Sequence, residues 1–177
     1  IDIETTGLNP EKHQILSIGI IVEDTKKKLS FEEIPKLHLG IVHKELRGGL
    51  FALNMNVELI KLINKYDMSD EKDKNDLSIE HDMIFTTEEE ACYQILSFLG
   101  ENGFNTVPIK FTAAGKNFAT FDKLFLEKLP RWKQYFQVRQ RILDPTPYFI
   151  DWNEDEELPN LSKCKERAGF PNTVTHN

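Results

Sequence analysis

Two acidic residues, Asp2 and Glu4, stand two positions apart in the opening segment, residues 1–8 (IDIETTGL). The apolar residues that alternate with them indicate a β-strand, and residues two apart in a strand point to the same face of the sheet. Two carboxylates that lie side by side resist full ionisation unless a cation lies between them, and oxygen-only ligands suit Mg²⁺ or Mn²⁺. The plainer alternative is a pair of solvated acids at an exposed strand end. The flanking apolar residues and the Thr-Thr-Gly-Leu turn weaken that alternative.

A third carboxylate, Asp122, ends the segment Asn117–Asp122, which follows an apolar stretch and opens a predicted helix. We expect Asp122 in the first or second turn, on the side that faces the C-terminal edge of the strands. Ligand sites of open α/β sheets are commonly found at that edge. An acid early in a helix also compensates the helix dipole, so this position alone leaves both interpretations open.

The last candidate is His176, the next-to-last residue of the chain. Its imidazole titrates near neutral pH, as a general base must. A single histidine is more often a surface or core residue than a catalyst, so His176 gains meaning only in combination with the three carboxylates.

The elements that must position these residues follow from hydrophobic spacing. Apolar, β-rich runs predict strands at residues 15–23, 29–34, 36–42, 107–114 and 142–143. Apolar residues at helical spacing predict helices at 56–66, 87–99, 117–129, around 132–136 and at 161–168. The order, strands first and then alternating helix and strand, favours a mixed α/β sheet with helices on both faces.

Polar segments between these elements predict loops. The charged, low-complexity run that starts at residue 67 predicts a mobile loop around 67–86, inside the domain. The five acids of residues 151–157 predict a solvated loop, and Asp144, which precedes a proline, predicts the end of a strand in a turn.

The segment 131–141 interleaves basic and aromatic residues. Such a segment could bind a single strand by stacking and phosphate contacts. The alternative is an amphipathic helix that places Trp132 and Phe136 in the core, and the sequence leaves both open.

Composition narrows the class of protein. The chain has 177 residues and reads as one domain over 1–177. A net charge of -7 argues against a broad basic surface for duplex coating, although bound metal ions could supply positive charge at one point. The mean hydropathy is -0.44, and no apolar run approaches the roughly 18–20 residues of a membrane span. Cys92 and Cys164 lie far apart without a CxxC motif, which indicates reduced thiols in a cytoplasmic protein.

Taken together, Asp-x-Glu on the first strand, Asn-x-x-x-Phe-Asp at a mid-chain helix and a late histidine resemble the DEDDh family of 3′–5′ exonucleases. That family includes proofreading subunits of replicative polymerases, ribonuclease T and oligoribonuclease. The resemblance covers nearly the whole chain in the right order. It implies a ribonuclease-H-like fold, with a mixed central sheet flanked by helices. It also implies that two divalent ions, Mg²⁺ or Mn²⁺, support hydrolysis of single-stranded DNA or RNA from the 3′ end to nucleoside 5′-monophosphates.

The same resemblance implies a role for each matching residue. Asp2, Glu4 and Asp122 would hold the metal ions, and His176 would accept the proton of the attacking water. Glu4 and the backbone of Thr5 and Thr6 would grip the terminal 3′-OH. The remaining substrate contacts would come from Leu8, as a wedge against the last base, and from the nucleotide pocket residues Asn117 and Phe121.

The family places a further aspartate a few residues after its histidine, whereas this sequence stops one residue after His176. The first strand is also already running at residue 1. We therefore expect the natural protein to be longer at both ends.

Two other functions remain open at this point. One is a catalytically inactive module of the same fold that binds nucleic acid or a protein partner. The other is an aspartyl phosphatase, but its strand-one pattern is Asp-x-Asp, so Glu4 and the segment Asn117–Asp122 count against it. For an exonuclease, the expected partner is a single-stranded 3′ end rather than a membrane. A homodimer or a polymerase partner is compatible with the family.

Overall fold

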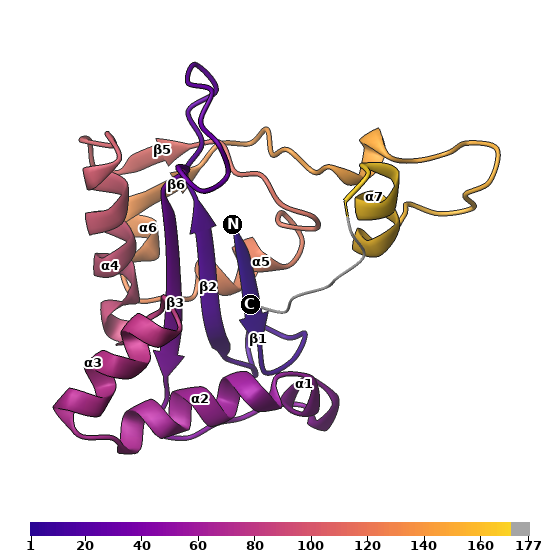
Figure 1. The fold of residues 1–177 in the computed structure, drawn as a ribbon. Helices are drawn as coiled ribbons and strands as arrows, with labels where there is room; N and C mark the ends of the chain where they lie inside the picture. Colours follow the sequence, from indigo (N-terminus) through magenta and orange to yellow (C-terminus); the bar gives the residue numbers. More distant parts are fainter. Residues whose placement is uncertain (171–177) are drawn as a thin grey trace.

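A computed structural model describes residues 1–170 of the chain (Figure 1). Its helices and strands are, in chain order, β1 (Asp2–Thr5), β2 (Ile15–Ile21), β3 (Lys36–Val42), α1 (Leu50–Met55), α2 (Val57–Met68), α3 (Glu71–Glu80), β4 (Ile84–Thr87), α4 (Glu88–Glu101), β5 (Ile109–Phe111), α5 (Asp122–Leu126), α6 (Trp132–Tyr135), β6 (Phe136–Val138), the 3₁₀ helix η1 (Thr146–Tyr148) and α7 (Leu161–Arg167).

The main sheet has four strands in the order β1-β2-β3-β4. β2 runs antiparallel to both β1 and β3, whereas β3 and β4 are parallel. Strands β5 and β6 form a second, parallel pair. The N-terminal NH₃⁺ group of Ile1 donates to the carbonyl of Ala114 at 3.0 Å, so the chain that leaves β5 runs beside β1. The predicted mixed sheet with flanking helices is confirmed, and its topology fits the expected ribonuclease-H-like class.

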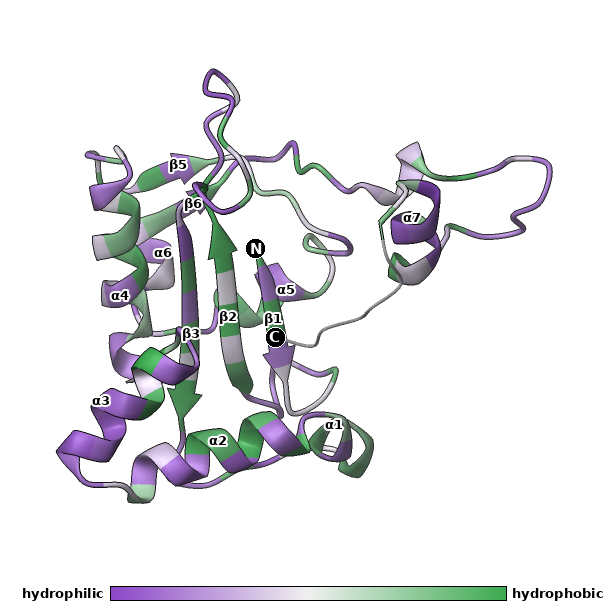
Figure 2. Cartoon of the chain, viewed as in Figure 1, coloured by the Kyte–Doolittle hydropathy of each residue, from purple (hydrophilic) through white to green (hydrophobic). Residues whose placement is uncertain are grey.

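One face of the main sheet supplies the core. Ile3, Ile18 and Leu39 stand in register across β1, β2 and β3 and are at most 6% exposed. They pack in one apolar cluster with residues of α4, α5 and α6, among them Ala91, Cys92, Ile95, Leu99, Phe125, Leu126 and Trp132. In Figure 2 the strands β2 and β3 are largely hydrophobic, whereas α3 is largely hydrophilic. Burial of these apolar side chains is what fixes the sheet under the candidate site.

The other face of the sheet is small and polar. On this face Asp2, Gly19 and His38 stand in register across β1, β2 and β3, each one position along its strand from the buried Ile3, Ile18 and Leu39. At the far end of this face, a Cβ at Gly40 would lie 2.6 Å from Met83 Sδ, so side chains that follow α3 cover that end. A second apolar cluster, Leu16, Ile63, Met83 and Phe85, joins α2 to the sheet there.

The prediction of a mobile loop around 67–86 is wrong. The segment forms the end of α2, the helix α3 and the strand β4. The side chain of Asp70 caps α3 by accepting from the backbone N–H groups of Lys72 and Asp73, and such a cap stabilises a helix by ~1 kcal/mol. Leu77 and Met83 are buried at 3% and 4% exposure. Three buried apolar residues, Leu77, Met83 and Phe85, and one cap order a segment whose remaining composition is that of a loop.

Two further strand predictions are wrong in extent, because they assign more residues to strands than the structure does. Residues 29–34 form turns, and the strand starts only after Pro35, at Lys36. In the predicted strand 107–114 only Ile109–Phe111 forms a ladder, and Leu143 makes an isolated bridge to Ala114.

Several helix predictions hold. Helices α2 and α4 lie where the spacing predicts them, and Asn160 caps α7 by accepting from the N–H of Lys163 at 2.9 Å. Trp132 and Phe136 are both in the core, as the amphipathic alternative predicts, although Phe136 begins strand β6. The helix expected after Asn117 starts later, at Asp122. None of the helices within residues 1–170 combines the length and apolarity that a bilayer crossing requires.

Candidate active site

Asp2 and Glu4 share one face of β1, as the sequence predicts. They stand opposite Gly19 and Ser17 of β2, and both line a groove of about 1050 Å³ over the polar face of the sheet. Asp2 is exposed and Glu4 is half-buried. Because their neighbours on β2 are a glycine and a serine, the two carboxylates meet no bulky side chain across the strand pair.

Asp122 reaches the same strand from the other end of the sequence. It is the first residue of α5 and is 3% exposed. Its Oδ1 accepts a hydrogen bond from the backbone N–H of Ile3 at 3.1 Å, across 119 positions of sequence. The fold therefore attaches Asp122 to β1 between Asp2 and Glu4.

The electrostatics of Asp122 are unusual for a carboxylate. Its pKa is raised to about 6, mainly by burial and to a smaller extent by the negative charge of Asp2, against the hydrogen bonds from its own backbone and from Ile3. A shift of one pKa unit corresponds to ~1.4 kcal/mol between the two protonation states. Perturbed carboxylates of this kind are typical of functional sites.

The donor set fits Mg²⁺ or Mn²⁺ in chemical type, because it consists of carboxylate oxygens. Asp2 and Glu4 line the same groove, and the negative charges of Asp2 and Asp122 repel each other. Within residues 1–170, however, no group of three or more His, Cys, Asp and Glu side chains gathers closely enough to hold an ion. His176 lies outside the described residues. The metal centre therefore remains a prediction.

The turn after β1 is held by side-chain hydrogen bonds. Thr5 donates through Oγ1 to the carbonyl of Gly7 at 2.8 Å, and Thr6, fully buried, donates to the carbonyl of Arg47. Asn56 donates through Nδ2 to the carbonyl of Thr5 at 3.2 Å. The backbone of Thr5 and Thr6 is thus rigid, whereas Leu8 at the tip is 82% exposed and available for contact.

A glycine pair packs directly against this turn. The N–H of Gly49 donates to the carbonyl of Thr6 at 2.9 Å. A Cβ at Gly48 would come within 2.6 Å of that same oxygen, whereas a Cβ at Gly49 would meet nothing within 4 Å. The sequence marks these glycines only as a loop, and neither they nor Asn56 carries a local signal of contact with β1.

The two predicted pocket residues Asn117 and Phe121 lie on the approach to Asp122. Asn117 is exposed, with a left-handed backbone (φ 58°), and its carbonyl accepts from the N–H groups of Thr120 and Phe121 at 3.0 Å. Phe121 is half-buried, with its ring 5.2 Å from that of Phe125. Neither lines the groove above Asp2 and Glu4.

His38 also lines the groove, and sequence reasoning assigned it no role. Its Nε2 is buried and has no hydrogen-bond partner among the described residues. Burial lowers the pKa of His38, while Asp82 raises it by a smaller amount. The alternation along β3 places His38 on this face, but only the register reveals that it stands in the row of Asp2.

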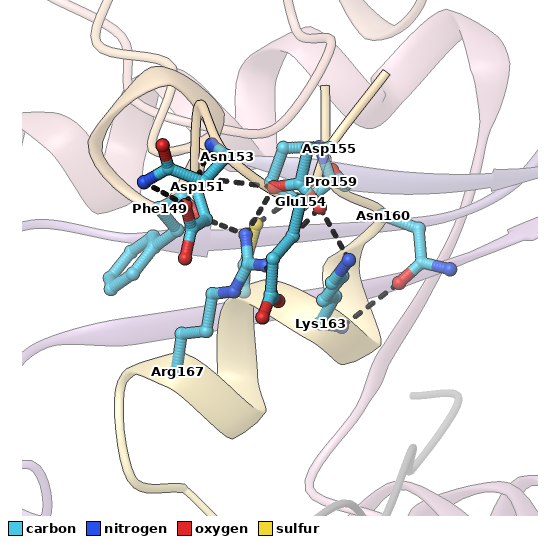
Figure 3. Close-up of polar contacts among 10 residues, drawn as sticks. Phe149, Asp151, Asn153, Glu154, Asp155, Pro159, Asn160, Lys163 and Arg167 are labelled. Atoms are coloured by element: carbon cyan, nitrogen blue, oxygen red, sulfur yellow. Dashed lines mark hydrogen bonds and ion pairs between the residues drawn. The ribbon is translucent and has the colours of Figure 1, made fainter. Parts of the chain in front are cut away.

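A second charged cluster lies away from the sheet, around α7 (Figure 3). The side chain of Asp155 is 4% exposed and accepts from Lys163 Nζ and from both terminal nitrogens of Arg167. The N–H of Asp151 adds a hydrogen bond of 2.9 Å. These contacts hold the pKa of Asp155 well below its usual range, led by the hydrogen bond from Arg167. The prediction of a solvated acidic loop at 151–157 is therefore wrong for Asp155.

Known proteins resemble this chain over its full length. It is 27% identical to the oligoribonuclease of Baumannia cicadellinicola subsp. Homalodisca coagulata over 177 residues, which cover 99% of this chain and 80% of that protein. It is 28% identical, with the same coverage, to the oligoribonuclease of Pasteurella multocida (strain Pm70). The oligoribonuclease of Aliivibrio fischeri (strain ATCC 700601 / ES114) is 25% identical, with 99% of this chain and 82% of that protein covered. No protein-family model matches the sequence.

Proposed function

We propose that this chain is a 3′–5′ exonuclease that hydrolyses single-stranded RNA, starting from its similarity to oligoribonucleases over 99% of its length. Oligoribonucleases are DEDDh-type exonucleases, so the resemblance that the sequence motifs indicate is confirmed. The relatives do not favour the alternative of an inactive binding module. Dependence on Mg²⁺ or Mn²⁺, and any activity on DNA, are part of the proposal.

One observation carries the proposal furthest. The hydrogen bond from Ile3 N–H to Asp122 Oδ1 joins the two motifs that the family uses, although they lie 119 positions apart. The carboxylate of Asp122 is buried close to the charge of Asp2, and both the burial and that charge disfavour its ionised form, which costs stability. Such a cost is typical of sites where function requires the charge.

Each of the chain's candidate residues would have a separate role in the reaction. Two divalent ions bound by Asp2, Glu4 and Asp122 would supply a water of lowered pKa and stabilise the leaving 3′ oxygen. His176 would accept the proton that the attacking water loses. The phosphodiester bond then breaks, leaving a 5′-phosphate on the released nucleotide and a 3′-OH on the shortened strand.

The turn after β1 would position the substrate. Because Thr5 and Thr6 are fixed by Asn56 and Arg47, their backbone can hold a terminal 3′-OH without reordering. Glu4 would accept a hydrogen bond from that hydroxyl, and Leu8, exposed at the tip of the turn, would contact the last base.

A nuclease assay tests this function. The longest available natural chain is incubated with 5′-labelled single-stranded RNA and DNA of matched sequence, with Mg²⁺, Mn²⁺ or EDTA. We expect RNA to shorten from its 3′ end, and we expect EDTA and the variant Asp2→Ala to abolish the shortening.

The matched control is Asp24→Ala. Asp24 is an exposed carboxylate on the loop between β2 and β3, where it accepts from Lys26 N–H. This variant should cleave as the parent does. If folded protein with metal present cuts neither polymer, the exonuclease proposal is wrong and a binding module becomes the better explanation.

A further inference from the structure

Asp144 ties two separate turns together. Its Oδ2 accepts from the backbone N–H of Asn117 at 2.9 Å, and its Oδ1 accepts from the N–H and the Oγ1 of Thr146 at 2.8 and 2.5 Å. Thr146 is 2% exposed. The carboxylate of Asp144 therefore links the buried Thr146 to the exposed turn at Asn117.

Leu143, the residue before Asp144, reinforces this link. Leu143 donates through its N–H to the carbonyl of Ala113 at 2.9 Å and accepts from the N–H of Gly115 at 3.0 Å. Ala113 is 2% exposed. Residues 113–117 are thus held along their length by residues 143–144, and Asp144 supplies the last contact before the chain turns.

The turn held by Asp144 leads directly to Asp122. Asn117 is in the left-handed backbone region, which asparagine tolerates better than most residues other than glycine. Its carbonyl accepts from Thr120 and Phe121, and the carbonyl of the fully buried Phe118 accepts from Lys123 at 3.0 Å. The position of Asn117 therefore sets where α5 begins.

Each end of this turn is anchored by one carboxylate. Asp144 holds Asn117 at the start, and Asp122 holds Ile3 of β1 at the end. Since the turn between them is short and internally hydrogen-bonded, a shift at Asn117 would move Asp122 relative to Asp2 and Glu4.

We propose that Asp144 is a positioning residue that sets the place of Asp122 beside Asp2 and Glu4 through the N–H of Asn117. This inference rests on the proposed function, in which those three carboxylates hold the metal ions. Residues that orient metal ligands from behind typically change metal affinity or activity by 10- to 100-fold when replaced.

An amide cannot replace this carboxylate. Both oxygens accept from N–H donors, so the NH₂ group of an asparagine would face a donor at one of the two positions whichever way it turned. Burial raises the pKa of Asp144, but the hydrogen bonds from Thr146 and Asn117 outweigh it, and the net shift is downward. Asp144 is therefore ionised near neutral pH, and Asp144→Asn removes one contact while the side-chain shape stays almost unchanged.

Amide hydrogen exchange measures the contact without reference to activity. In Asp144→Asn we expect the Asn117 amide to exchange about tenfold faster than in the parent protein, in EDTA, at a temperature where both are folded. The control is Asp24→Asn, which removes a carboxylate from a similar turn with Lys26 and should leave the Asn117 amide unchanged.

The Mg²⁺ dependence of RNA cleavage separates positioning from general loss of structure. We expect the half-saturating Mg²⁺ concentration to rise about tenfold in Asp144→Asn, with most of the activity recovered at high Mg²⁺. A variant that merely loses folded protein would show lower activity at an unchanged half-saturating concentration. Asp144→Glu, which keeps the charge but moves it, should behave like Asp144→Asn and serves if the first variant folds poorly.

Two results would overturn the inference. Unchanged exchange at Asn117 would show that Asp144 does not hold the turn. Faster exchange with an unchanged Mg²⁺ dependence would show that the turn does not position Asp122. If the parent protein cleaves no RNA, the proposed function fails instead, and the exchange measurement alone decides whether Asp144 holds the turn.

Discussion

Two carboxylates of this protein, Asp122 and Asp155, have opposite electrostatics. Asp122, at 3% exposure, lies against β1, where burial and Asp2 raise its pKa to about 6. The Asp155 side chain, at 4% exposure, lies between Lys163 and Arg167, and its pKa is lowered. Burial is the largest influence on the pKa of Asp122, whereas at Asp155 the hydrogen bonds from Arg167 and Lys163 outweigh it. The difference is that the protein supplies positive side chains to Asp155, and a backbone N–H to Asp122.

This difference is the one expected between a structural ion-pair cluster and the metal site proposed at Asp122. The Asp155 cluster ties the loop after η1 to α7, and its charges are satisfied within the chain (Figure 3). At Asp122 the surroundings include another negative charge, that of Asp2. A site prepared for divalent cations requires such an excess of negative charge.

The largest expected effect is on activity. Asp122→Asn keeps an oxygen that can accept from Ile3 N–H but removes the charge that would hold the metal. Metal stabilisation of the transition state is worth several kcal/mol, and each ~1.4 kcal/mol is tenfold in rate, so kcat/KM for RNA should fall about 10³-fold. Asp155→Asn should lower it less than tenfold. Similar losses in both variants, measured on folded protein, would contradict the division between the two sites.

The next effect is on stability at the Asp155 cluster. Arg167→Ala leaves the Asp155 carboxylate buried without its bidentate partner, and breaking such a pair is strongly destabilising. We expect the melting temperature, followed by circular dichroism, to fall by several degrees. The control is Arg47→Ala, which breaks an exposed pair with Glu45 and should change almost nothing. Equal melting temperatures for the two variants would mean that the cluster does not hold α7.

Added Mg²⁺ should raise the melting temperature only through the site that contains Asp122. A ligand at 100 times its dissociation constant stabilises a protein by ~2.7 kcal/mol, and 1 kcal/mol shifts the melting temperature of a chain of this size by ~2–4 °C. Saturating Mg²⁺ should therefore raise the melting temperature of the parent protein by roughly 5–10 °C over EDTA. Asp155→Asn should respond equally, and Asp122→Asn should not. An equal response in Asp122→Asn would place the metal elsewhere.

The smallest effect has opposite signs at the two sites. In EDTA near pH 7, Asp122→Asn should stabilise the protein by roughly 1–2 kcal/mol, because it removes a buried charge whose folded pKa is raised. The gain should disappear as the pH falls from about 6 to 4, where Asp122 becomes protonated. Asp155→Asn should destabilise near pH 7, and its deficit should shrink only below about pH 4, since a lowered pKa contributes stability above the unfolded value. Chemical denaturation over this pH range measures both, and shifts of the same sign would refute the comparison.

The sequence predicted where the three carboxylates lie in the fold better than it predicted the surrounding elements, and their role in a site stays a prediction. Asp2 and Glu4 were assignable because strand periodicity is local and needs no knowledge of the partner strand. Asp122 was assignable because it opens a helix after a buried strand. The exact contact, with Ile3 N–H, could not be predicted, since it joins residues 119 positions apart.

The errors have a common physical cause. In the segment 67–86, three buried apolar residues among many charges outweighed composition, and periodicity could not detect so few. The sequence predicted a solvated Asp155, because its partner Arg167 lies 12 positions away in a helix whose orientation the sequence does not reveal. Asp144 looked like a simple turn residue for the same reason, because its contact with Asn117 spans 27 positions. The role of His176 stays a prediction.

The glycine pair beside Thr6 has a consequence for sequence variation. Position 48 admits no side chain without moving the Thr6 carbonyl, whereas position 49 has open space around it. A library that randomised both positions would therefore return glycine at 48 and a broad mixture at 49. Two adjacent residues that look interchangeable in the sequence differ in their freedom to mutate, and that freedom is set by the backbone of the turn after β1.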